Sequence, residues 1–122
     1  MTNTNFSNNK QYDLEERTLN FAKRARNLVK KMHKSISNFE DAKQLVRSSG
    51  SIGANYIEAN EALSKKDFKM RIKISKKEAK ESRYWLKLID IKNQALEKER
   101  KRLIQEATEL MKILGSILEK SK

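Results

Sequence analysis

Residues 47–60 read RSSGSIGANYIEAN and contain two of the chain's three glycines, Gly50 and Gly53. Such a small and polar run is typical of a loop, and its Gly-x-x-Gly spacing matches that of KH domains and resembles phosphate-cradling loops. The apolar residues around it, however, recur at steps of three and four, which is the period of a helix. A phosphate loop would also need a strand before it and a Lys-Ser/Thr pair after its last glycine. We therefore predict a helix that is thin on one face, where another helix comes close.

The same spacing continues in both directions and predicts four long helices, each with one apolar face. The residues of these faces are Leu14, Thr18, Phe21, Ala25, Leu28 and Met32, then Ala42, Leu45, Ser49, Ile52, Tyr56, Ala59 and Leu63, then Phe68, Ile72, Ser75, Ala79, Ser82, Leu86 and Ile89, then Leu96, Leu103, Ala107, Leu110, Leu114 and Ile117. Connections of a few residues make consecutive helices antiparallel neighbours. The predicted fold class is all-α, an antiparallel up-down-up-down four-helix bundle.

Capping patterns place the ends of these helices. Asp13, Asn38 and Ser64 each precede an acidic residue by three positions, so we expect helices to begin near them. A break at residues 92–94 should separate the third helix from the fourth. In the second helix, Ser49, Gly53 and Asn60 lie on the predicted packing face. Ser49 and Asn60 should then find hydrogen-bond partners inside the bundle.

The composition agrees with long helices in one domain. The 122 residues include no Pro, no Cys and three Gly, and 36% of them are charged. Residues 1–12 are mostly Asn, Thr and Ser and should form a disordered or frayed polar tail, with residues 13–122 as the bundle domain. The absence of cysteine fits a reducing cytosol. Because no apolar run could form a signal peptide or a membrane span, we expect a soluble, cytoplasmic protein.

Positive charge dominates the surface chemistry. Twenty-eight Lys and Arg face sixteen Asp and Glu, a net charge of +12. Such a field favours polyanionic partners, although a merely solvated basic surface is an alternative. The cations gather in two helical stripes, for which we predict contacts to nucleic-acid phosphates. The residues assigned to this role are Lys66, Lys69, Lys73, Lys76, Lys80, Arg83 and Lys87, together with Lys23, Arg26 and Lys30.

The third helix is also apolar beyond one packing face. Met70, Ile74, Trp85 and Leu88 lie on or beside a second line at helical spacing. They could be scattered surface residues, which are common. We favour a contact with another subunit, because a small bundle would otherwise expose a sizeable apolar patch. A cyclic homo-oligomer is the usual outcome of such a surface.

The sequence gives little support for an enzyme, a metal site or a cofactor. His33 is the single histidine, so Glu-x-x-His pairs and a Ser-His-Asp triad are not available. We expect its charge to favour the end of the first helix. Glu58 with Glu61, and Glu78 with Glu81, could hold a cation, but pairs of surface acids are far commoner. We expect no catalytic residue, no metal and no cofactor.

Two stretches resemble a known family, SSGSIGANYIEANEALSKKDF (48–68) and KISKKEAKESRYWLKLI (73–89). They are similar to the ribosomal-RNA intervening-sequence proteins, whose pattern is Ser-Ile-x-x-Asn-Ile-x-Glu-Gly/Ala, then Ser-x-x-Asp/Glu-Phe, then a helix centred on Ser-x-x-Glu. The matching residues are Ser51, Ile52, Asn55, Glu58 and Ala59, then Ser64, Asp67 and Phe68, then Ser75 and Glu78. Tyr56 and Ile57 depart slightly from the commonest spelling.

The resemblance implies a bundle that assembles as a ring, typically a homopentamer, without known catalytic residues. The family includes proteins encoded inside inserts in bacterial large-subunit rRNA genes. It is also similar to the accessory variability determinant of diversity-generating retroelements, a basic pentameric barrel that binds nucleic acid and a reverse transcriptase. The expected partners are therefore copies of the chain itself and RNA or DNA. An adaptor role toward a reverse transcriptase or another protein is the alternative.

Overall fold

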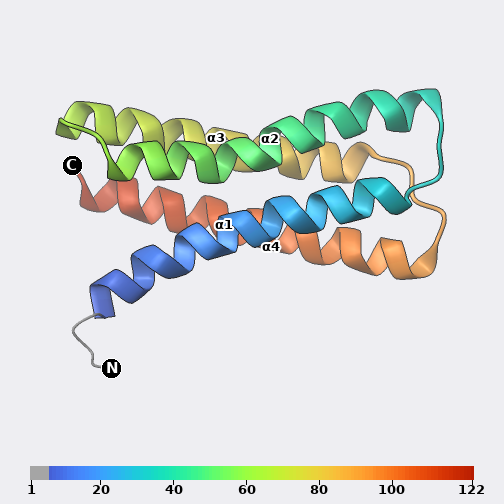
Figure 1. Cartoon of the computed structure of the whole chain (residues 1–122), viewed down its shortest axis with the longest axis horizontal. Coiled ribbons are helices and arrows are strands. Elements are labelled where there is room, and N and C mark those ends of the chain that lie inside the picture. The colour runs from blue at the N-terminus through green and yellow to red at the C-terminus, as the bar shows by residue number, and fades with distance from the viewer. Residues whose placement is uncertain (1–5) are drawn as a thin grey trace.

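The computed structural model describes the backbone of residues 6–122 and the side chains of residues 14–122. The described residues form α1 (Phe6–Lys31), α2 (Ile36–Asn60), α3 (Lys65–Leu88) and α4 (Gln94–Lys120), and none of them forms a strand. The four helices lie side by side in an elongated bundle (Figure 1). The predicted all-α, four-helix class is confirmed. No helix in residues 6–122 combines the length and the apolar character that a membrane span requires.

The helices occupy the corners of a square when the bundle is viewed along its axis. The α2–α3 contact is the most extensive, α3 also packs on α4, and α1 packs on α2 and α4. Consequently α1 and α3 are diagonal to one another, as are α2 and α4. The connections at residues 32–35 and 89–93 lie at one end of the bundle, and the C-terminus lies at the other, beside the α2–α3 connection (Figure 1).

The end of the bundle near residues 32–35 is organised by Asn38, in a way that corrects the predicted cap. Ser35, not Asn38, caps α2, because its Oγ accepts a hydrogen bond from the Asn38 backbone N–H at 3.1 Å. The Asn38 side chain is buried instead. Its Nδ2 donates to the backbone oxygens of His33 (3.2 Å) and Asp90 (2.9 Å), and its Oδ1 accepts from the Asp90 N–H at 2.9 Å. One amide therefore ties both connections together.

The other predicted helix starts have mixed outcomes. Ser64 caps α3 by accepting from the Asp67 N–H at 3.0 Å, as predicted, and Asn93 caps α4 within the predicted break. The predicted start of α1 at Asp13 is wrong, since α1 already begins at Phe6. Residues 6–12 contain no Gly or Pro, and extending an existing helix gains one hydrogen bond per residue without a new nucleus. Residues 1–5 of the predicted tail lie outside the described residues.

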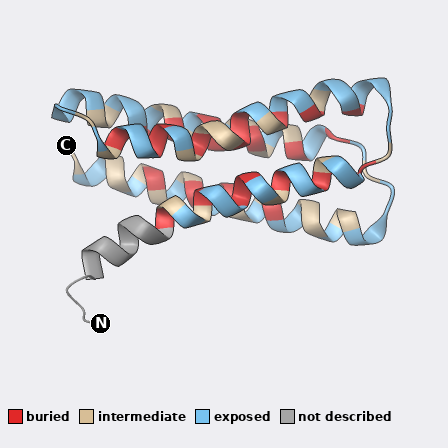
Figure 2. Cartoon of the chain, viewed as in Figure 1, coloured by how far each residue is buried: buried red, intermediate tan, exposed pale blue. Residues whose placement is uncertain are grey.

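The core follows the predicted faces closely (Figure 2). Every predicted residue of the first face is buried, and so is the second face except for Leu63, which is 99% exposed. The assignment of Leu63 to the core is wrong because α2 ends at Asn60 and Leu63 lies in the connection. Phe68, Leu96 and Ile117, near the ends of the bundle, are only half-buried against the core.

The two glycines of RSSGSIGANYIEAN lie inside α2, and they differ in their surroundings. A Cβ placed on Gly53 would lie 2.8 Å from Thr18 Oγ1 and 3.2 Å from Thr18 Cβ, so α1 comes against the α2 backbone here. A Cβ on Gly50 would meet only the end of the Arg26 side chain, with its first contact at 3.4 Å. Gly53 therefore permits the α1–α2 contact, whereas Gly50 leaves room for one more carbon.

We predict that Gly53→Leu lowers the free energy of unfolding by about 1–3 kcal/mol, because the added side chain overpacks the contact with Thr18. Gly50→Leu is the matched control, and it should destabilise less, because an added Cβ there first meets the end of the Arg26 side chain at 3.4 Å. Urea unfolding followed by circular dichroism measures both changes. Equal effects at the two positions would contradict the assignment of close approach to Gly53.

Candidate nucleic-acid interface

The predicted basic stripe follows α3 along the side that borders α4. Lys76 lies over Gly115 of α4, where an added Cβ would be 3.3 Å from its Nζ, and Arg83 donates to Thr108 Oγ1 at 3.2 Å. The remaining members are exposed or half-buried, and they are Lys66, Lys69, Lys73, Lys80 and Lys87. The helix as a whole carries ten Lys and Arg against three Asp and Glu, whereas α2 carries two against three. The charge of the protein is therefore concentrated on α3.

The lysines and arginines of the chain have different environments. Each of the eight arginines, all within residues 14–122, has a hydrogen-bond or ion-pair partner. Among the lysines whose side chains are described, four have such a partner, namely Lys43, Lys65, Lys92 and Lys122. The six lysines of the α3 stripe are not among them. Their ammonium groups are available to an anionic ligand.

Two Arg–Glu ion pairs join α1 to α4. Arg17 donates from Nε (3.0 Å) and Nη2 (2.8 Å) to the two carboxylate oxygens of Glu106, and Arg24 donates in the same way to Glu99, at 2.9 and 3.2 Å. The two ion pairs are seven residues apart along each helix, so together they favour one register of α1 against α4. The hydrogen bond to Glu99 raises the pKa of Arg24 although partial burial opposes the shift.

Arg47 occupies the carboxylate pair that could have bound a cation. It contacts Glu78 at 3.1 Å and Glu81 at 2.9 Å, and the hydrogen bond to Glu81 raises the pKa of its guanidinium. Within residues 14–122, no three side chains of His, Asp or Glu gather as a metal site would require. His33 lies in the connection after α1, and its Nε2 is 3.3 Å from Asp90 Oδ2. It pairs with this carboxylate rather than with the end of its own helix.

An open hollow marks the first half of α3. It has a volume of about 540 Å³ and is lined by Met70 and by four lysines, Lys65, Lys66, Lys69 and Lys73. Lys65 was absent from the predicted contacts because it falls outside the three-four spacing. Its position next to Lys66 at the start of the helix is the sequence feature that could have identified it. Four neighbouring ammonium groups make this hollow the most cationic part of the stripe.

The family assignment follows from comparison with known proteins. The sequence profile of the 23S rRNA-intervening sequence protein family matches residues 10–116. The chain belongs to this family. A crystal structure of a protein of unknown function from the S23 ribosomal protein family of Bacteroides thetaiotaomicron VPI-5482 is similar to it. The two share 36% sequence identity with a TM-score of 0.76, over 90% of this chain and 98% of the other. None of the curated proteins matches the chain.

The second basic run of this intervening-sequence protein lies on a different corner of the bundle. Lys23, Arg26 and Lys30 are exposed on α1, which is diagonal to α3. Within one chain, the structure does not bring the two predicted groups of phosphate-binding residues onto a single face. Arg24, in the middle of the run, is committed to Glu99.

The predicted subunit-contact residues are exposed to different degrees. Met70 and Leu88 are each 49% exposed, whereas Ile74 and Trp85 are half-buried. Trp85 packs against the core and meets the ring of Tyr84 edge-on, with ring centroids 5.0 Å apart. The apolar surface of α3 thus centres on Met70 and Leu88, with Trp85 partly serving the fold.

The predicted packing residues of α2 have unequal hydrogen bonding. Ser49 is buried and donates to the Val46 carbonyl of its own helix at 3.3 Å. The Nδ2 of Asn60 is buried without a hydrogen-bond partner among the described residues. The sequence prediction missed Ser48, whose hydroxyl lies 2.8 Å from that of Ser82 in α3. Its neighbour Ser49 was chosen because it lies nearer the midline of the predicted face.

Proposed function

We propose that this protein is a non-enzymatic, basic homo-oligomer that binds RNA or DNA through phosphate contacts in the cytoplasm. Each subunit is an antiparallel up-down-up-down bundle, and the assembly is a cyclic pentamer. The observation that carries the proposal is the row of lysines on α3 without partners among the described residues, in a chain whose arginines are all bonded. A stripe that only served solubility would need no such concentration on one helix.

The stripe has the length and chemistry of a backbone-binding surface. Lys66 and Lys87 are 21 residues apart, which corresponds to about 31 Å of helix. Like charges three or four residues apart repel each other by a few tenths of a kcal/mol per pair, and phosphates would remove this repulsion. The stripe consists of Lys and Arg alone, which bind phosphates without distinguishing bases, so binding should be largely independent of sequence.

The family description favours RNA as the first ligand to test. It refers to sequences that intervene in 23S rRNA. Duplex and single-stranded nucleic acids both present the phosphates that the stripe would bind, so DNA of the same sequence is the natural comparison. The proposal does not require discrimination between them.

We predict that wild-type protein binds mixed-sequence RNA and DNA at low salt, with a steep salt dependence. Engagement of all seven stripe cations by duplex DNA would give a slope of log K against log salt of about −6. Replacing Lys73, Lys76 and Lys80 by Glu should weaken binding and reduce the slope by about 3. Fluorescence anisotropy across a salt series measures both quantities.

The matched control replaces Lys98, Lys101 and Lys112 of α4 by Glu. These lysines are exposed and without partners among the described residues, and the change in net charge is the same. It should reduce affinity less than the α3 triple. Equal losses would mean that binding follows net charge rather than the stripe, and no binding at low salt would refute the proposed function.

We predict that Met70→Asp and Leu88→Asp lower the molar mass of the assembly toward the 14.3 kDa of one chain. A buried carboxylate at a subunit contact is strongly unfavourable. Multi-angle light scattering measures the mass. Leu63→Asp is the control, because Leu63 is 99% exposed on the α2–α3 connection and is not one of the predicted contact residues. A wild-type monomer, or equal dissociation by all three variants, would contradict the oligomer proposal.

The alternative function is an adaptor for another protein, such as a reverse transcriptase. It is favoured by the large apolar side chains that remain exposed outside α3, including Phe39 and Ile57 on α2. Phosphate binding has no use for them. An adaptor should retain a stoichiometric protein partner at high salt during purification from its native host, whereas nucleic acid would be released.

A further inference from the structure

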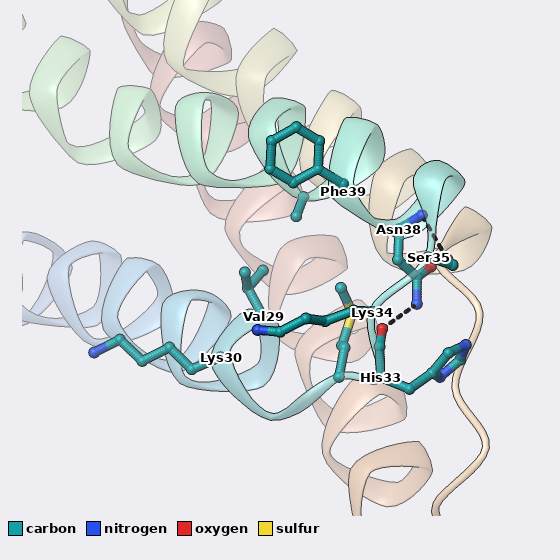
Figure 3. A pocket seen from close by; sticks show the side chains of 9 residues that line it. Val29, Lys30, His33, Lys34, Ser35, Asn38 and Phe39 are labelled. Carbon is teal, nitrogen blue, oxygen red and sulfur yellow. Dashed lines mark hydrogen bonds between the residues drawn. The ribbon is translucent and has the colours of Figure 1, made fainter.

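An open groove separates α1 from α2 near residues 32–35. Two adjoining hollows form it, with volumes of about 250 and 430 Å³, and both are lined by Val29, Phe39 and Ala42. The larger one extends along α2 to Val46. Figure 3 shows Val29 and Phe39 on facing helices, with the Lys34 side chain extending back along the end of α1 toward Val29. We call these residues and their charged border the α1–α2 groove.

The floor of the α1–α2 groove is apolar and accessible. Phe39 is 64% exposed, and Val29 and Val46 are half-buried. Phe39, Ala42 and Val46 are three and four residues apart, so they form one ridge along α2, with Val29 opposite. A ridge and a facing side chain of this kind accept the apolar face of a further helix.

The border of the groove is cationic. Lys30 and Lys34 have no partner among the described residues, and no acidic side chain lines either hollow. Lys43 lies 4.8 Å from the centroid of the Phe39 ring and pairs with Glu40, and Arg47 at the far end contacts Glu78 and Glu81. The unpaired charges of the border are therefore those of Lys30 and Lys34. Charge complementarity therefore calls for an acidic occupant.

We propose that the α1–α2 groove docks an acidic amphipathic helix of a partner protein. Apolar side chains of that helix, one turn apart, would cover Phe39 and Val46, and its carboxylates would meet Lys30 and Lys34. This inference rests on the adaptor function. No α3 residue lines either hollow, and of the predicted phosphate-contact residues only Lys30 borders the groove.

The test uses a fluorescein-labelled peptide of eighteen residues with leucines on one helical face and glutamates on the others. One control peptide has the same composition with the leucines redistributed so that no face forms, and another has lysine in place of glutamate. We expect only the acidic amphipathic peptide to bind in anisotropy titrations near physiological salt. Phe39→Ala, and separately Lys30→Glu with Lys34→Glu, should each weaken it at least tenfold.

Matched variants outside the groove separate docking from general attraction. Ile36→Ala removes an apolar side chain that is 87% exposed, and Lys98→Glu with Lys101→Glu removes the same charge from α4. Both should leave the peptide affinity within twofold, as should charge reversal on α3. Circular dichroism verifies that each variant is folded. Binding of the redistributed peptide, or equal effects of Phe39→Ala and Ile36→Ala, would overturn the proposal.

Four further outcomes show whether the groove has a different occupant and whether the groove inference or the adaptor function has failed. A loss of assembly mass on Phe39→Asp would identify a self-interface, and reduced RNA affinity of Phe39→Ala would identify a nucleic-acid surface. Either result overturns the proposal. If a native partner co-purifies equally with wild type and Phe39→Ala, the adaptor function stands and the groove inference fails. If no partner co-purifies at high salt, the adaptor function itself fails.

Discussion

The packing of α2 on α3 through buried serine hydroxyls is the constraint on which the rest of the bundle depends. Ser75 donates to the Ile52 carbonyl at 2.7 Å, and the hydroxyls of Ser48 and Ser82 are 2.8 Å apart. All three serines are fully buried, so an unpaired hydroxyl here would cost about 1–3 kcal/mol. Their small size lets the two helices approach closely. Their hydrogen bonds favour one register, because a shifted register would leave buried hydroxyls unpaired.

That register decides which charges are neutralised and which remain free. Arg47 meets Glu78 and Glu81 across the same seam, and Arg71 meets the Asn55 side chain at 3.0 Å. With one side of α3 held against α2, its lysines lie at the opposite edge, beside α4. The planar guanidinium suits fixed two-point contacts, whereas the ammonium is a mobile point charge. Arginines such as Arg17, Arg24 and Arg47 accordingly join neighbouring helices, whereas the lysines of the α3 stripe have no partner among the described residues.

The sequence predicted the apolar faces well because helical periodicity depends only on local spacing. Leu45, Ile52 and Leu110, for example, belong to apolar faces that were predicted from steps of three and four residues, and all three are fully buried. It failed where the outcome depends on a distant residue. The role of Asn38 needs the backbone of Asp90, 52 positions away, and nothing near Asn38 signals that partner. Its own spacing to Asp41 was a valid capping pattern, and tertiary hydrogen bonds prevailed over it.

The candidate interface shows the same division between local and distant information. The α3 stripe was visible in the sequence because its members share one helix. That its lysines have no partner among residues 14–122 could be seen only in the packed bundle. The second basic run could not be placed, since the relation of α1 to α3 is set by the order of helices around the core. Sequence spacing shows on which side of its helix a residue lies. It does not show which other helix lies next to that side.

The diagonal placement of α1 and α3 limits how one chain can engage a polyanion. Neighbouring helix axes in a bundle are about 8–10 Å apart, so diagonal axes are about 11–14 Å apart, and outward-pointing lysines are farther apart still. This exceeds the screening length of about 8 Å at physiological ionic strength. If the chain binds a polyanion as proposed, the two basic runs would act as separate sites within one subunit. The proposed oligomer would then gain affinity by aligning equivalent stripes of several subunits rather than by joining both runs of one.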